Sequence, residues 1–383
     1  MRTYKYRIYP TKSQETLLNQ QLEICRWVYN KTLSVRKDAW EQEGRSIGMY
    51  DTFNMLPEWK KVEPKFKLVH SQVLQNVQTR VELAYKAFFR RVKAGEEPGY
   101  PRFKGRGWYD SMCYPQYGNG AKLTGNQLNL SKIGSVKVKL HRELCGTPKT
   151  VCVRRGAAGK WFVTFACDCV DIALPDEVKA VGVDVGLASF ATLSDGSKIA
   201  NPRFFRKSAT KLAVAQRKME KLAKGSLERS KKRQIVSRIH EHTANKRSDF
   251  AHKVSRQLAN TYGTICFEDL NIKQMIEQKT QVFGNKLNKS IADVAWNQLV
   301  QFTTYKAESA GRRVVLVDPR NTSKRCSRCN ILVPKDLSVR THNCPSCGLV
   351  LDRDHNAAIN ILALGLQRIN AGLPDEVVEA QEL

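Results

Sequence analysis

The apolar residues in the first half of the chain follow two different periods. They recur at helical spacing over about 17–33 and 68–92, and Thr11 with Gln14 has the pattern of a capping box before the first helix. Short alternating runs, typical of strands, occupy 4–9, 135–140, 150–153 and 161–167. We therefore expect a small OB-like β-barrel with a helical module inserted after its first strand.

Each predicted helix has one apolar face that we expect to form the core of this module. On the first helix this face contains Leu17, Leu18, Leu22, Cys25, Val28, Tyr29 and Leu33. On the second helix it contains Val69, Val73, Val77, Val81, Ala84, Phe88 and Val92. A stretch rich in glycine, proline and aromatic residues, 95–120, follows the helices.

From about position 180 the pattern changes to apolar strands separated by helices. The apolar run 181–186 is interrupted by Asp184, and the strand 264–268 ends on Glu268. The remaining expected elements are a hairpin at 190–200, a long basic helical region at 206–262, a helix near 291–309, a strand at 313–317 and a helix at 355–369, before an acidic mobile tail. This order predicts an α/β domain after a boundary near Pro175.

Charge narrows the possible functions more than length does. The 383 residues contain 64 Lys and Arg against 36 Asp and Glu, a net charge of +28. An enzyme for small metabolites does not need so positive a surface potential, whereas a protein that binds the phosphate backbone of a nucleic acid does. No segment approaches the roughly 20 apolar residues of a membrane span, and the N-terminus lacks the apolar core of a signal peptide. We expect a cytoplasmic prokaryotic protein that binds nucleic acid and no membrane.

The eleven cysteines fall into two groups. Two CxxC pairs, separated by fourteen residues, predict one closed tetrahedral zinc site: Cys326, Cys329, Cys344 and Cys347. Four buried cysteines or two redox pairs are the alternative interpretation. The other seven are scattered, and we expect buried thiols in a reducing compartment without disulfides: Cys25, Cys113, Cys145, Cys152, Cys167, Cys169 and Cys266.

Three carboxylates stand where a catalytic site would need them. Asp184 and Glu268 lie on apolar strands, and an unpaired buried carboxylate requires a partner or a metal. Asp354 lies at the start of the last helix. This order matches an RNase H-like fold, in which three acids hold two Mg²⁺. Each acid could instead cap a strand or a helix, and the pattern leaves open whether Asp269 or Asp352 takes part.

Two regions have the composition of nucleic-acid surfaces. Between Arg203 and Arg256 there are 17 Lys and Arg and 4 acids, a net charge of +13. A solvated helix face would carry more Glu, so we expect contacts with a nucleic-acid backbone, with Lys246, Arg247 and Lys253 as candidates. Around the cysteines, Arg325 is a further candidate among a group of basic residues that suggests phosphate contacts: Lys324, Arg325, Arg328, Lys335 and Arg340.

The second helix has a polar uncharged stripe opposite its apolar face. Its members follow helical spacing: Gln72, Gln75, Asn76 and Thr79. Gln and Asn side chains pair with adenine in the major groove, although an ordinary solvent-exposed face explains the spacing equally well.

These motifs together resemble a known family, the TnpB (OrfB) proteins of bacterial insertion sequences, which are relatives of the compact type V CRISPR effectors. The matching segments cover nearly the whole chain: 26–30, 71–75, 182–186, 245–250, 267–270, the two cysteine pairs and 352–361. One departure is Asn330, where the first cysteine pair of the family is often followed by glycine.

The resemblance implies an RNA-guided DNA endonuclease encoded by a transposable element. Its guide RNA would come from the transposon end, and the protein, as a monomer, would read a short adjacent motif in double-stranded DNA. By the family pattern the catalytic acids are Asp184, Glu268 and Asp354. The family also places its motif reader near the helix that carries Gln72, which favours DNA readout by the polar stripe.

The resemblance also implies a division of the chain into parts. These are a wedge barrel (1–10 and 114–178), a helical recognition module (11–113), a RuvC-type nuclease (179–320 and 351–371), an inserted zinc ribbon that contacts the target (321–350) and a tail (372–383). Three other functions remain open: a guided repressor that does not cut, a transposase that joins DNA strands, and a junction resolvase that needs no RNA.

Overall fold

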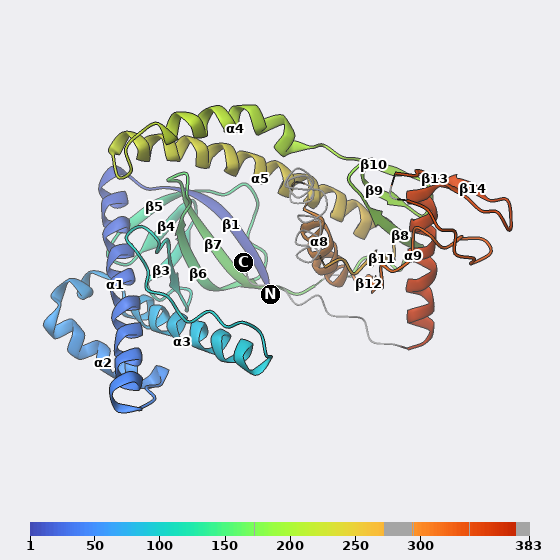
Figure 1. The fold of residues 1–383 in the computed structure, drawn as a ribbon. Helices are drawn as coiled ribbons and strands as arrows, with labels where there is room; N and C mark the ends of the chain where they lie inside the picture. The colour runs from blue at the N-terminus through green and yellow to red at the C-terminus, as the bar shows by residue number, and fades with distance from the viewer. Residues whose placement is uncertain (172, 272–292, 294, 337, 373–383) are drawn as a thin grey trace. The chain divides into compact units, whose positions relative to one another are not determined.

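The computed structural model describes residues 1–383 except 172, 272–292, 294, 337 and 373–383. The chain forms two compact units, Met1–Val170 and Asp171–Leu383 (Figure 1). The helix predicted near 291–309 begins in part outside the described residues, at 291, 292 and 294. The tail after 372 also lies outside them. No described helix combines the length and the apolar character that crossing a membrane requires.

A seven-stranded antiparallel sheet forms the centre of the first unit, with strand order β2-β6-β7-β1-β5-β4-β3. The strands are β1 (Arg2–Tyr9), β2 (Ser111–Tyr114), β3 (Ala121–Thr124), β4 (Gln127–Leu130), β5 (Gly134–Lys139), β6 (Thr147–Arg155) and β7 (Trp161–Asp168). In β1, Tyr4, Tyr6 and Ile8 alternate into the core. The expected strands exist, but β2, β3 and β4 were not predicted, because they are only four residues long and have mixed polarity.

The helices of the first unit are inserted between β1 and β2, as predicted. They are α1 (Lys12–Glu43), α2 (Met49–Val62), the short η1 (Pro64–Leu68) and α3 (Ser71–Lys93). The capping box at Thr11 is present: its side chain accepts from the N–H of Gln14, and the Gln14 side chain accepts from the N–H of Thr11. The helix α2 was not predicted from the sequence.

Two residues predicted in the core of the helical module are exposed. Leu17 is 38% exposed, because its neighbour Leu18 takes the buried direction of α1. Val92 is 49% exposed, since α3 buries side chains only from Val73 to Tyr85 and its last turn extends past the core.

The expectation that the seven scattered cysteines are buried thiols is wrong for several of them. Cys113 and Cys152 face each other on the paired strands β2 and β6, where a disulfide joins them. Cys145 is exposed and Cys169 is half-buried. The remaining three are buried thiols: Cys25, Cys167 and Cys266. The error arose because β2 was not recognised as a strand, so nothing in the pattern placed Cys113 opposite Cys152.

The second unit contains a five-stranded sheet with the order β10-β9-β8-β11-β12. Its strands are β8 (Ala180–Val185), β9 (Ser189–Leu193), β10 (Lys198–Ala200), β11 (Thr264–Glu268) and β12 (Arg313–Val317). The strands β8, β11 and β12 are parallel, and β9 and β10 add an antiparallel hairpin. The chain is thus of mixed α/β class, as expected.

Helices and a small two-stranded sheet complete the second unit. The basic region folds as α4 (Phe204–Glu220) and α5 (Leu227–Thr261), which pack against each other. The later elements are α8 (Trp296–Ser309), β13 (Thr341–Asn343), β14 (Val350–Asp352) and α9 (Arg353–Asn370). The helix α9 packs on β8, β9 and β11, so its first turn lies near the strand that carries Asp184.

Candidate metal centres and nucleic-acid interface

Two neighbouring parallel strands carry Asp184 and Glu268 to the same edge of the sheet. Asp184 follows the buried residue Val183 in β8, and Glu268 is the last residue of β11. Val183 pairs with Phe267 across these strands, so Glu268 lies level with Asp184. Both carboxylate side chains are half-buried.

The third acid reaches this edge because α9 approaches β8 very closely. A Cβ atom on Gly182 would collide with the backbone carbonyl of Ala358 and with the backbone nitrogen of Leu362, so the contact requires glycine. Asp354 lies one helical turn before Ala358, at the start of α9. The close contact therefore brings the Asp354 carboxylate towards Asp184.

The two acids that the sequence left as alternatives have other positions. Asp269 is exposed. Asp352 caps α9 by accepting hydrogen bonds from the backbone N–H groups of Asp354 (3.0 Å) and His355 (3.1 Å). Asp352 also forms an ion pair with Lys198 at 2.8 Å. The Asp352 side chain thus caps the helix, which is the alternative role that the sequence pattern left open for these acids.

The carboxylates repel one another strongly at this edge. Burial raises the pKa of Asp184 well above its ordinary value, and the charges of Glu268 and Asp354 raise it further, with a smaller effect from Asp352. Burial also raises the pKa of Glu268, although a 2.6 Å hydrogen bond from the Thr322 hydroxyl opposes this. Half-buried carboxylate oxygens that repel one another are the ligands that a hard divalent cation such as Mg²⁺ prefers.

Two arginines lie next to Asp354, and the sequence did not assign either of them to the acids. The distance from Arg353 Nε to Asp354 Oδ1 is 3.3 Å, and that from Arg340 Nη1 is 3.8 Å. Arg340 is 57% exposed and was predicted only as one of several basic residues around the cysteines. Nothing in the spacing could reveal this contact, because Arg340 reaches Asp354 through the fold of the cysteine segment.

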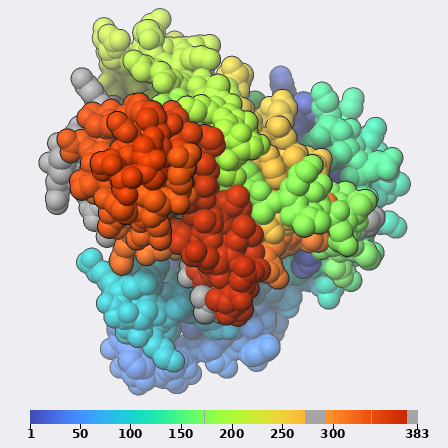
Figure 2. Space-filling model, turned by 90° about the vertical axis from the view of Figure 1, so that its right-hand side faces the viewer, coloured from blue at the N-terminus to red at the C-terminus, as the bar shows by residue number. Residues whose placement is uncertain are grey.

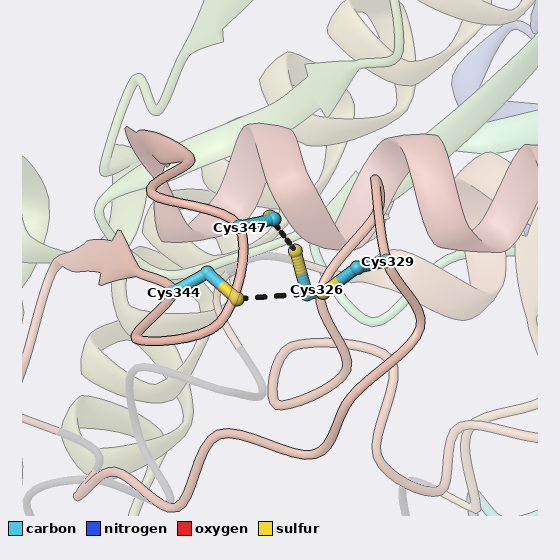
Figure 3. Close-up of side chains that lie close together, drawn as sticks. All are labelled: Cys326, Cys329, Cys344 and Cys347. Atoms are coloured by element: carbon cyan, nitrogen blue, oxygen red, sulfur yellow. Dashed lines mark hydrogen bonds between the residues drawn. The ribbon is translucent and has the colours of Figure 1, made fainter.

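The four clustered cysteines form the second candidate metal centre, as predicted (Figure 3). Cys326 Sγ lies 3.5 Å from Cys347 Sγ, and Cys329 Sγ lies 3.5 Å from Cys344 Sγ. All four sulfurs lie within 4.8 Å of one another, and no other set of three or more such side chains in the described ranges does so. The carboxylates around Asp184 are thus less tightly gathered than the cysteines.

The chemistry of the cysteine cluster fits a zinc ion. Backbone N–H groups of Cys347 and Ser346 lower the pKa of Cys344 to about 6. The Leu349 N–H acts in the same direction on Cys347, yet burial and the neighbouring sulfurs raise the pKa of Cys347 to about 12. Without a cation the cluster therefore retains a proton, whereas Zn²⁺ would neutralise all four thiolates.

Two asparagines of α9 attach the cysteine segment to the helix that carries Asp354. Asn356 accepts from the Ser327 N–H (3.0 Å) and donates to the Arg325 carbonyl (2.8 Å). Asn360 donates to the carbonyls of Thr322 and Arg325, both at 2.7 Å. In Figure 2 the cysteine segment and α9, in orange and red, lie side by side on the visible face. The sequence motif contained both asparagines, but only their four-residue spacing hinted at a shared role.

The predicted phosphate contacts differ in their availability. Lys246 is exposed, and Lys253 is exposed but forms an ion pair with Asp249 at 2.8 Å. Arg247 is half-buried. The Arg325 guanidinium donates to the carbonyl and side-chain oxygens of Asn330 at 3.1 and 3.2 Å, so it also stabilises the first cysteine turn.

The polar stripe of α3 lies on one side of the helix, as its spacing predicts. Gln72 donates to the Gln116 side chain at 2.7 Å, and Asn76 accepts from Arg80 at 3.1 Å. Thr79 bonds back to the Gln75 carbonyl at 3.1 Å, and Gln75 is exposed. The stripe is therefore accessible in part, and the residues after β2 contact one end of it.

Comparison with known proteins assigns the family. Residues 165–279 match the OrfB family model described as "Probable transposase", and 296–361 match "Cas12f1-like, TNB domain". The chain is 37% identical to "Putative RNA-guided DNA endonuclease" of Streptomyces pristinaespiralis, across 95% of this chain and 89% of the relative. It is 31% identical to "Putative RNA-guided DNA endonuclease InsQ" of Escherichia coli K12, across 95% and 92%. The chain belongs to the TnpB (OrfB) family.

A solved structure has the same fold as this TnpB-family chain. The match to "Cryo-EM structure of the Cas12f1-sgRNA-target DNA complex" has a TM-score of 0.57 at 16% identity, and it covers 91% of this chain and 82% of the other. Residues 1–45 also match a model described as "Helix-turn-helix domain". In this TnpB-family chain, however, that segment is one strand followed by the single helix α1.

Proposed function

We propose that this TnpB-family chain is an RNA-guided DNA endonuclease encoded by a transposable element. It would bind a guide RNA from the transposon end, recognise a short adjacent motif, and cleave double-stranded DNA by Mg²⁺-dependent phosphodiester hydrolysis. The printed names of its relatives support this function. The observation that carries it for this chain is the convergence of Asp184, Glu268 and Asp354 at a partly buried edge, where burial and then the charges of the other two acids raise the pKa of Asp184.

In this proposal the second unit is a RuvC-type, RNase H-like nuclease. Asp184, Glu268 and Asp354 are the catalytic acids and would hold the metal ions through their carboxylate oxygens. Bound Mg²⁺ would supply activation of the attacking water and stabilisation of the leaving 3′-oxygen. Thr322 fixes the orientation of Glu268 through its 2.6 Å hydrogen bond. The exposed Arg340 beside Asp354 is placed to contact a phosphate near the acids.

The other parts of the chain would bind and position nucleic acid. We assign residues 321–350 to a zinc ribbon, 1–10 and 114–178 to a wedge barrel, and 11–113 to a recognition module whose polar stripe reads the adjacent motif. The helices α4 and α5, with Lys246, Arg247 and Lys253, would contact the guide RNA or heteroduplex backbone. The active ribonucleoprotein would contain one copy of the chain and act in the bacterial cytoplasm.

The test uses the chain purified together with the RNA-encoding end of its element. The complex is incubated with Mg²⁺ and a plasmid library in which a guide-matched target adjoins randomised bases. We expect double-strand breaks confined to one adjacent motif and dependent on the RNA. Sequencing the broken ends gives the motif and the cut positions together.

Other outcomes of this experiment would identify the other functions. Guided binding without breaks would indicate a repressor, and joined strands in place of free ends would indicate a transposase, the activity that the family description names. Cutting of branched DNA without RNA would indicate a junction resolvase. Absence of RNA from the purified protein would contradict the guided function.

A further inference from the structure

The disulfide of the first unit lies directly beneath the polar stripe of α3. Cys113 on β2 and Cys152 on β6 are opposite each other in an antiparallel pair, with 4.2 Å between their Cα atoms. Both residues are half-buried, so small thiols can reach them. The helix α3 packs on β2, which places the pair under the helix that carries Asn76.

One arginine connects this cysteine pair to the stripe. The Arg80 guanidinium donates through Nη2 to Cys113 Sγ at 3.2 Å and through Nε to Asn76 Oδ1 at 3.1 Å. Its Nη1 donates to the Ser111 carbonyl at 3.0 Å and to the Tyr109 hydroxyl at 3.2 Å. The groups that Arg80 contacts in these bonds are all neutral while the disulfide is closed.

Opening the disulfide changes the charge next to Arg80. A guanidinium beside a cysteine favours the thiolate, which is the form that attacks disulfides. A Cys113 thiolate would attract the Arg80 guanidinium more strongly than the neutral disulfide sulfur does. The same guanidinium donates a hydrogen bond to the Asn76 side chain. The oxidation state of the cysteine pair therefore affects the strength of that hydrogen bond and the orientation of Asn76.

We propose that Cys113 and Cys152 are a thiol–disulfide exchange site that takes low-molecular-weight disulfides such as oxidised glutathione, and that its state adjusts the DNA-reading stripe through Arg80. The Cys113 thiolate attacks one sulfur of oxidised glutathione and releases a glutathione thiolate. The Cys152 thiolate then attacks Cys113 in the mixed disulfide and releases the second glutathione thiolate. Two electrons pass from the protein to the small disulfide, and the two cysteine protons pass to the released glutathione. The effect on the stripe rests on the proposed function.

The first experiment tests the exchange site without reference to DNA. The full chain is equilibrated in mixtures of reduced and oxidised glutathione, the free thiols are alkylated, and non-reduced peptides are mapped by mass spectrometry. We expect a Cys113–Cys152 link that forms at oxidising ratios and reopens with added reduced glutathione while the chain stays folded. The matched control is Cys145→Ser, which removes an exposed cysteine on another loop and leaves the link unchanged. A pair that is never linked, or never reopened in the folded chain, would overturn the proposal.

The second experiment tests the coupling through Arg80. The affinity of the guide-loaded chain for motif-bearing duplex is measured in the reduced and oxidised states. We expect a difference of about threefold to tenfold, which corresponds to roughly 0.6–1.4 kcal/mol. Arg80→Lys and Cys152→Ser should each abolish the dependence on redox state. Equal affinities in both states would overturn the coupling. A reversible link in a chain that binds no guided DNA would contradict the proposed function and support the exchange site.

Discussion

The two candidate metal centres of the second unit differ in how their ligand groups are stabilised when no ion is bound. The four sulfurs lie within 4.8 Å of one another, and backbone N–H groups already favour a thiolate at Cys344. At the carboxylate edge, burial and the charges of Glu268 and Asp354 raise the pKa of Asp184, and the nearby Arg353 opposes this only in part. A closed cluster of thiols is typical of a structural ion, and an open edge of repelling carboxylates is typical of a catalytic one.

The two centres are nevertheless joined mechanically. Asn356 and Asn360 bind the backbone of the cysteine segment, and the same helix carries Asp354 at its start. Under the proposed function, zinc would therefore act on cleavage indirectly, by fixing the position of α9, whereas Mg²⁺ would act at the acids themselves. Four substitutions separate these roles.

The largest effect is expected from Asp184→Ala. The proposed metal site loses a ligand worth several kcal/mol of transition-state stabilisation, so guided cleavage should fall by roughly 10³-fold or more. Binding of RNA and target DNA should be retained, because Asp184 lies outside the basic segment 203–256 and its proposed role is to hold the metal ions. The measurement is cleavage rate together with target affinity. The matched control is Asp269→Ala, which removes an exposed acid next to Glu268. This variant should cleave at the normal rate. Loss of binding in Asp184→Ala would remove Asp184 from the chemistry.

Cys344→Ser should have the next largest effect. Losing one thiolate releases the zinc ion and unfolds the cysteine segment, so Asp354 is no longer held through α9. We expect cleavage to fall by about 100-fold, within the range seen for residues that orient metal ligands. Zinc content is measured by release to a chromogenic chelator, with Cys145→Ser as the control. A variant that keeps both its zinc and its activity would show that the four-thiolate site is wrong.

Asn356→Ala tests the connection between the centres. The side chain is fully buried, and its removal leaves the Ser327 N–H without its side-chain partner, at a cost of about 1–3 kcal/mol, whereas the Arg325 carbonyl keeps its hydrogen bond from Asn360. We expect zinc to remain bound while cleavage falls about tenfold. Gln367→Ala, an exposed change on the same helix, serves as control. Unchanged cleavage in Asn356→Ala would mean that the cysteine segment and the acids act independently.

The smallest effect concerns stability. The folded-state pKa of Asp184 is raised, so its charge opposes folding above that pKa, and the opposition disappears as the pH falls through it. Asp184→Asn should therefore raise the Tm at pH 8 in buffer without added Mg²⁺, by about 2–4 °C for each kcal/mol gained. The gain should shrink towards acidic pH. A gain that does not vary with pH would point to packing and not to charge.

The sequence was sufficient for features that rest on local pattern. The capping box at Thr11, the strands β8 and β11, and the four clustered cysteines follow from spacing and were predicted. The choice of Asp354 over Asp352 came from family resemblance, because both acids lie at the start of the same helix. In the structure, Asp352 caps α9 and forms an ion pair with Lys198.

Features that depend on long-range placement were not predictable. The strands β2, β3 and β4 are too short and too polar for periodicity to show, so the pairing of Cys113 with Cys152 was missed. The contact between Arg340 and Asp354 joins two segments through the fold of the cysteine turns. Neither contact leaves a periodic signal in the sequence.

The position of the helical insertion has a consequence for protein engineering. The chain leaves the sheet after β1 and returns at β2, an edge strand, so the intervening residues interrupt no pairing between central strands. A replacement module could vary in length without shifting the strand register. It would have to keep the buried faces of α1 and α3, because residues such as Val28 and Val77 share one hydrophobic core with Tyr114 and the sheet. A new binding surface can thus be grafted onto the outer faces of these helices while their inner faces are retained.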